Sequence, residues 1–138
     1  MLKKITESVF SFDVEWIPDP KSAEILHQTP SASGSMENAR LSFESLWQDA
    51  RKPEEDESIQ PYLKTILCRI VSIAGILRDC PRGGEPQLKL ISLPTDPNDP
   101  AKCEEKVLIT SFLKSVGRRK PQLVGFNSAQ ADIPIIIQ

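Results

Sequence analysis

The longest apolar stretch of the chain, TILCRIVSIAGIL at residues 65–77, constrains the fold more than any other feature. Its residues are nearly all apolar or β-branched, as is typical of a strand covered on both faces. RDCPRGGE, at 78–85, carries a proline and two glycines and predicts a turn. QLKLISL, at 87–93, predicts a second strand. The centre of the chain therefore predicts a β-hairpin.

A helical pattern follows this hairpin. Asp99 is placed to cap a helix with Pro100 at its first position, and we expect the helix over about residues 101–116. Its inward-facing residues would be Leu108, Phe112, Leu113 and Val116. Gly117 and the cations at 118–120 predict the end of the helix, where positive charge suits the helix dipole. The same cations could instead contact phosphates.

Strands near both ends of the chain complete the predicted sheet. Residues 8–16 alternate apolar and polar side chains, and QLVGF, at 122–126, predicts a short buried strand. The helix before this last strand acts as a crossover, which would place it parallel to the first strand. The pattern predicts an α/β fold with a mixed sheet in the order strand, strand, strand, helix, strand.

Residues 17–60 interrupt this pattern. They contain four prolines, the run SASGS, the acidic run Glu54–Glu57 and one short helical pattern at 37–50. We interpret the segment as a long insertion that is partly helical. It could equally form a flap beside a substrate.

Composition limits the possible functions. With 138 residues and 39% apolar content, the chain can build the core of one domain. Its net charge of −2 predicts no bulk attraction to phosphate backbones, so contacts with nucleic acid would be local. Three cysteines without a CxxC pair predict reduced thiols and a cytoplasmic location, and no apolar run is long enough to span a membrane. The single histidine argues against Ser–His or Cys–His catalysis and against structural zinc.

The segment SFDVEW raises a question of charge. Its apolar residues are Phe12, Val14 and Trp16. Asp13 and Glu15 share the other face of the strand, where two carboxylates roughly 6–7 Å apart repel by about 2–3 kcal/mol at an effective dielectric of about 20. Either both acids face water, or a divalent cation compensates their charge.

A third acid could join this pair. Asp132 follows the last strand, and the carboxyl ends of adjacent parallel strands are where α/β sheets place ligands. Three carboxylates without histidine form an all-oxygen environment suited to Mg²⁺ or Mn²⁺. At least one of these groups should then titrate above the ordinary pKa of a carboxyl group.

Three segments together resemble a known family. FDVEW resembles the first acidic motif of DEDD-type 3′–5′ exonucleases, and GFNSAQADIPII resembles their second motif. IQPYLKTILCRIVSIAGIL is similar to the second-strand region of predicted 3′–5′ exonucleases related to the proofreading domain of family B DNA polymerases. The resemblance spans most of the chain except residues 17–58. It implies a ribonuclease H-like fold.

The resemblance also implies a reaction. Asp13 would bridge two divalent cations, Mg²⁺ or Mn²⁺, Glu15 would bind the cation that carries the attacking water, and Asp132 would hold the second cation. The activity would be metal-dependent 3′–5′ hydrolysis of nucleic acid, at single-stranded or mismatched DNA ends more than RNA. Asp132 could instead only cap the helix that follows it.

Other residues would contact the substrate. The resemblance implies that Asn127 positions the acidic loop or contacts the terminal nucleotide, with Phe126 and Trp16 as further substrate contacts. Asn127 is also a good turn residue, and Trp16 could be a core residue instead of a stacking platform. An alternative for the whole chain is a non-catalytic module of the same fold that binds nucleic acid or a protein.

Two departures from the family pattern affect these expectations. Ala131 stands where the family has an aromatic residue. The fourth acid, preceded in this family by a tyrosine four residues earlier, has no counterpart, since the only tyrosine is Tyr62. We therefore expect residues 1–138 to be the N-terminal part of one exonuclease domain, inactive in isolation. We also expect self-association through the apolar segment at 133–137.

Overall fold

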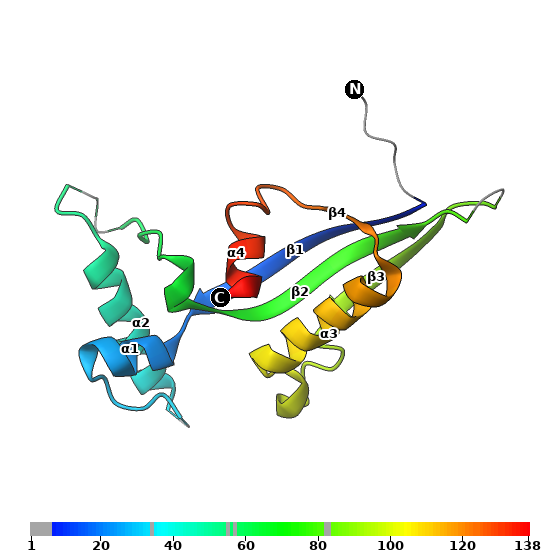
Figure 1. Cartoon of the computed structure of the whole chain (residues 1–138). Helices are drawn as coiled ribbons and strands as arrows, with labels where there is room; N and C mark the ends of the chain where they lie inside the picture. The colour runs from blue at the N-terminus through cyan, green and yellow to red at the C-terminus, as the bar shows by residue number, and fades with distance from the viewer. Residues whose placement is uncertain (1–6, 34, 55, 57, 82–83) are drawn as a thin grey trace. The chain divides into compact units, whose positions relative to one another are not determined.

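The structure is a computed structural model that describes residues 7–33, 35–54, 56, 58–81 and 84–138 (Figure 1). The chain divides into two compact units. The first joins Met1–Trp16 to Ile70–Gln138, and the second is Ile17–Arg69. The insertion expected at residues 17–60 lies within the second unit.

One mixed sheet forms the centre of the first unit. Its strands are β1 (Ser8–Pro18), β2 (Cys68–Asp79), β3 (Gln87–Leu93) and β4 (Gln122–Val124), in the spatial order β3-β2-β1-β4. β2 and β3 pair antiparallel, which confirms the predicted hairpin. β1 and β4 pair parallel, with Phe10 opposite Leu123, so the crossover helix places the last strand beside the first as predicted. The Cys80 N–H donates to the Glu7 carbonyl at 2.7 Å, which sets the end of β2 beside the start of β1.

The apolar face of β1 packs against helix α3 (Glu105–Arg119). Phe10, Phe12 and Val14 are buried, as the alternation predicted. The ring of Phe112 in α3 lies 5.3 Å from that of Phe12 and 6.1 Å from that of Phe10 between centroids. Because successive side chains of a strand point to opposite faces, Asp13 and Glu15 lie on the other face and are exposed.

The start of α3 differs from the sequence expectation. Asp99 accepts a hydrogen bond from the Ala101 N–H, but it caps only the 3₁₀ turn η2 (Pro100–Lys102). Glu104 has extended backbone angles, with φ −63° and ψ 129°, so the α-helix begins at Glu105. There the Glu105 carboxylate accepts the Ile70 N–H of β2 at 2.6 Å. A hydrogen bond between two residues that are distant in the sequence therefore lies at the start of this helix.

The end of α3 also differs. The helix continues through Gly117 to Arg119, and Lys120 takes the left-handed cap position with φ 48°. Arg118 and Arg119 occupy the last turn, and an Arg119 Nη1 lies 3.9 Å from a carboxylate oxygen of Asp79. These placements support helix-end charge as the role of the cations.

Two strands are less covered than predicted. Thr65–Leu67 forms the 3₁₀ turn η1, so β2 begins at Cys68, and Ile76 in β2 is half exposed. β4 ends at Val124, and both Leu123 and Val124 are exposed. The prediction of a buried strand over 122–126 is wrong because β4 lies at the edge of the sheet order, where one side has no strand neighbour among the described residues.

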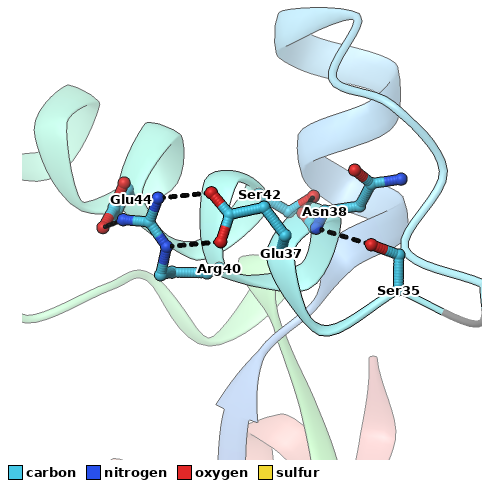
Figure 2. A network of polar contacts seen from close by, with 6 residues as sticks. All are labelled: Ser35, Glu37, Asn38, Arg40, Ser42 and Glu44. Atoms are coloured by element: carbon cyan, nitrogen blue, oxygen red, sulfur yellow. Dashed lines mark hydrogen bonds and ion pairs between the residues drawn. The ribbon is translucent and has the colours of Figure 1, made fainter.

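Two helices pack together in the second unit. They are α1 (Pro20–His27) and α2 (Met36–Ala50), which include buried Ala23 and Leu46 respectively. Figure 2 shows Ser35 capping α2, and Arg40 paired with Glu37 and Glu44 along its exposed side. α2 was expected from the pattern at 37–50, but α1 was not. Pro20 suggested a loop, yet it stands in the first helical turn, where a missing N–H costs nothing.

The cysteines agree with the sequence expectation. Cys68 is buried, Cys80 and Cys103 are half-buried, and none of the three forms a disulfide. Burial raises the pKa of the Cys68 thiol to about 11. Across the described residues, we find no helix with the length and apolar character needed to cross a membrane.

Candidate functional site

The two acids of β1 lie beyond its paired segment. β4 ends at Val124, which is opposite Ser11, so Asp13 and Glu15 follow the last paired residue of β1. They therefore lie at the carboxyl end of the one parallel strand pair among the described residues. This is the sheet end at which α/β proteins place ligands.

A tight turn connects β4 to helix α4 (Asp132–Ile137) and packs against β1. A Cβ added to Gly125 would lie 2.7 Å from the Ser128 Cβ and 3.3 Å from the Phe12 carbonyl oxygen. Glycine is therefore required at this close approach. Asn127 has φ 54°, and its carbonyl accepts the N–H groups of Gln130 and Ala131 at 3.0 and 3.2 Å. The turn role of Asn127 is thus present in the structure, and its contact with a nucleotide stays a prediction.

Asp132 follows this turn, and its side chain is buried. The residue is 3% exposed, and its Oδ2 has no hydrogen-bond partner. Asp132 is the first residue of α4, and the cap position belongs to Ala131, which makes no side-chain cap bond. The alternative that Asp132 is the helix cap is therefore wrong.

The charge state of Asp132 reflects its surroundings. Burial, followed by the negative charges of Asp13 and Glu15, raises the pKa of this carboxyl group above its ordinary value. In the structure, the charges of Asp13 and Glu15 in β1 thus act on the carboxyl group of Asp132 in α4. This result agrees with the expectation that one carboxyl group titrates high.

The chemistry of these side chains fits a hard divalent cation. Carboxylate oxygens are its preferred ligands, and a cation would offset both the mutual repulsion and the unpaired Oδ2 of Asp132. In the part of the chain that the structure describes, no three His, Cys, Asp or Glu side chains are gathered closely enough to hold a metal ion.

The expected substrate contacts differ in exposure. Phe126 is 96% exposed, directly after β4 and beside Asn127 in sequence. Trp16 is half-buried, and its contact with a substrate stays a prediction. Within α4, Ile135 and Ile136 are buried, whereas Ile133 and Ile137 are exposed, so the expected apolar segment over 133–137 is exposed only in part. Ile135 is wholly buried and Ile136 is 8% exposed, so these two side chains belong to the core, and self-association through the exposed remainder of the segment stays a prediction.

Sequence reasoning did not identify Gly125 and Ser128 as parts of the site. Both residues shape the turn that precedes Asp132. The Ser128 side chain lies close to where a Cβ at position 125 would be, and the Ser128 carbonyl accepts the Ile133 N–H at 2.8 Å. The available signal was a glycine inside the predicted strand over 122–126, because a glycine within a strand often marks the close approach of another part of the backbone.

The fold and the site together define an α/β domain with a mixed sheet and acidic residues at the end of a parallel strand pair. The model of one protein family, described as a predicted 3′–5′ exonuclease related to the exonuclease domain of PolB, matches residues 60–138. This match covers more than half of the chain, and the chain therefore belongs to this nuclease family. No curated protein and no solved structure matches the chain.

The matched residues contain only part of the site. Asn127 and Asp132 lie within them, whereas Asp13 and Glu15 precede them. Membership of an exonuclease family implies a nucleic acid substrate.

Proposed function

We propose that this chain forms a ribonuclease H-like domain for metal-dependent 3′–5′ hydrolysis of nucleic acid, with Asp13, Glu15 and Asp132 as its acidic site. The observation that carries the proposal is the buried Asp132, whose Oδ2 lacks a partner while two further acids act on it. A folded chain holds such a carboxylate at a cost in stability, so a function that needs the charge is the simplest explanation. The family match supports the nuclease class.

The three acids would divide the work of holding two Mg²⁺ or Mn²⁺ ions. Asp13 would contact both ions, Glu15 the ion on the side of the attacking water, and Asp132 the ion on the side of the leaving 3′ oxygen. When bound, the ions supply Lewis acidity for in-line cleavage of a phosphodiester. The rigid pairing of β1 and β4 would keep Asp13 and the turn to Asp132 in register.

The exposed Phe126 would stack on the terminal base, since an aromatic ring that is almost wholly exposed next to an acidic site is a suitable platform. Asn127 would orient the same nucleotide through its exposed amide. Both contacts favour an unpaired 3′ end, and we propose DNA as the more suitable substrate.

A second candidate is a non-catalytic module of the same fold that binds nucleic acid. One observation favours it: the described acids are not gathered into a metal-binding group. The two candidates differ in whether divalent cations bind at Asp13.

Thermal unfolding in Mn²⁺ tests the proposal. At about 10 mM Mn²⁺ acting on a site of millimolar affinity, linkage adds about 1.4 kcal/mol to the free energy of unfolding. We expect this stabilisation in the wild type and a smaller one in Asp13→Asn. The matched control is Asp49→Asn, an exposed acid of α2, which should respond as the wild type does. Equal responses of Asp13→Asn and the wild type would exclude a cation site at Asp13.

Hydrolysis is a separate readout. Residues 1–138 contain three of the four acids that the resemblance implies, so we expect no degradation of a 5′-labelled single-stranded DNA above a metal-only control. Degradation that is abolished in Asp13→Ala would show that the three acids suffice.

A further inference from the structure

Strand β3 lies at an edge of the sheet, on the far side of β2 from β1 (Figure 1). Its outer side has no strand neighbour in the part of the chain that the structure describes. Residues 73–79 of β2 face residues 93–87 of β3 one by one, so no bulge interrupts the pair. A regular edge strand offers unpaired N–H and C=O groups to another strand, and proteins usually prevent this with short strands, bulges, proline or charge.

The face of β3 that points away from α3 is apolar and exposed. Leu88 and Leu90 are 72% and 75% exposed, and Ile76, the β2 residue opposite Leu90, is 49% exposed. The three side chains share a face, because residues two apart in a strand and residues directly opposite each other point to the same side. They form an apolar patch beside the free edge, and such patches often mark interaction sites.

The other face of β3 is also incompletely covered. Ile91 and Leu93 are only half-buried, and they line an apolar hollow together with Phe112 and Val116 of α3. A strand that is apolar on both faces is typical of the interior of a sheet. β3 therefore has the sequence of an interior strand and the position of an edge strand.

The sequence of β3 suits antiparallel pairing with a second copy of itself. Pairing of all seven residues requires a two-fold axis at Leu90, which places Leu90 opposite its own copy and Leu88 opposite Ser92 of the other chain. Lys89 is the only charged residue of the strand, and in this register it faces Ile91 of the other chain instead of the other lysine. No like charges meet directly across the pair, and the net charge of −2 gives little repulsion between two chains.

We propose that β3 is a dimer interface, at which two copies of this chain join their sheets by antiparallel pairing of β3 with β3. The two apolar patches would lie on the same side of the joined sheet, so each Leu90 would be covered by its copy. The assembly would close at two chains, because β3 would be paired on both sides and β4, at the other edge, has three residues. Strand addition of this kind obtains its affinity from main-chain hydrogen bonds and its specificity from alternate side chains.

Sedimentation velocity of residues 1–138 tests the proposal. Since pairing of one strand buries less than a standard interface, we expect mostly monomer at about 5 µM and mostly dimer at about 500 µM. The buffer contains EDTA and no nucleic acid, so the result does not depend on the proposed nuclease site. A chain that stays monomeric at the higher concentration would overturn the proposal.

Two lysine variants locate the interface. Leu90→Lys places two like charges opposite each other at the two-fold axis, so the dimer should be lost at both concentrations. Leu90 is exposed, so circular dichroism should show an unchanged fold. The matched control is Ile137→Lys in α4, a residue that is also 75% exposed, and it should keep the dimer. A dimer that is kept in Leu90→Lys and lost in Ile137→Lys would assign self-association to residues 133–137 and overturn the proposal.

Cross-linking tests the register in a chain that carries Cys80→Ser and Cys103→Ser, since the remaining Cys68 is buried. Leu90→Cys should bring two thiols opposite each other, with Cα atoms about 4.5–5.5 Å apart, and a short thiol cross-linker should give a covalent dimer. Leu88→Cys, at a similarly exposed position, would separate the two thiols by about 13 Å along the strands and should give little product. Equal yields from the two variants, or a higher yield from Leu88→Cys, would contradict the proposed pairing.

Discussion

Asp132 shows how one residue can be unfavourable for folding and suitable for function. Its carboxylate is buried, one oxygen is unpaired, and two acids nearby oppose its ionisation. A residue selected for stability alone would not combine these features. Removing the charge should therefore stabilise the metal-free chain.

We predict that Asp132→Asn raises the free energy of unfolding at pH 7 by about 1 kcal/mol in metal-free buffer, because a neutral amide is less costly to bury than an unpaired carboxylate. Thermal or urea unfolding in EDTA measures the change. The same variant should lose the stabilisation by Mn²⁺. A less stable Asp132→Asn in EDTA would contradict this account of the site.

The advantage of Asp132→Asn should depend on pH. Because the folded state raises the pKa of Asp132, the folded chain binds this proton more tightly than the unfolded chain. This group therefore costs stability above its raised pKa, and the cost declines as pH falls toward the ordinary value of 3.8. Unfolding curves across this range should show the two proteins converging at low pH. A constant difference would mean that the ionisation of Asp132 is not its cause.

At the level of elements, two contacts hold parts of the first unit together. One is the close approach of the β4–α4 turn to β1 at Gly125. The other is the hydrogen bond from the Ile70 N–H to Glu105, which attaches the start of α3 to β2. Each joins segments that are distant in the chain, and each can be tested against a nearby residue of the same type.

Gly125→Ala should destabilise the fold by about 1–3 kcal/mol, because its Cβ would overlap Ser128 and force the turn away from β1. Gly117→Ala is the matched control. It lies inside α3 with no heavy atom within 4 Å of the added Cβ, so it should stabilise by up to about 1 kcal/mol. Chemical denaturation of both variants gives the comparison. If Gly125→Ala and Gly117→Ala changed the free energy of unfolding in the same direction, the turn would not pack as described.

Glu105→Ala should cost about 1.5–3 kcal/mol, since it leaves the N–H of the buried Ile70 without its charged acceptor. Glu105→Gln keeps an acceptor and should cost less. The adjacent Glu104 is exposed and makes no side-chain cap bond, so Glu104→Ala should change stability by less than about 0.5 kcal/mol. Similar losses of stability in Glu105→Ala and Glu104→Ala would mean that Glu105 acts only through its charge near the start of the helix.

On the scale of the whole molecule, the chain leaves β1 and returns to β2 at adjacent points. The Asp19 N–H donates to the Leu67 carbonyl at 2.8 Å, so the segment between them closes on itself like the loop of a hairpin. This closed segment corresponds closely to the second compact unit, Ile17–Arg69.

We predict that replacing residues 20–66 by an Asn-Gly turn leaves the sheet folded, because such a turn suits two adjacent antiparallel strand ends. Circular dichroism and thermal unfolding should show a cooperative transition. The shortened chain should keep the Mn²⁺ response. A chain that does not fold would show that the sheet depends on Ile17–Arg69.

Local pattern predicted most elements of this fold, but it did not predict α1, and Leu113, which was expected to face inward, is exposed. The alternation in FSFDVEW placed Phe10, Phe12 and Val14 in the core and left Asp13 and Glu15 outside, because the period of a strand is two. Pattern failed where neighbours in space decide, as at the start of α3 and at the exposed strand β4.

The state of Asp132 was decided by tertiary packing alone. Its sequence neighbours allowed either a helix cap or a metal ligand, and both agree with an aspartate before an apolar helix. The turn that leads to Asp132 lies against Phe12 at Gly125, and the raised pKa of Asp132 comes from burial together with the charges of Asp13 and Glu15. A pKa depends on the distance to charges and on the exclusion of water, and both are set by contacts between residues far apart in the chain.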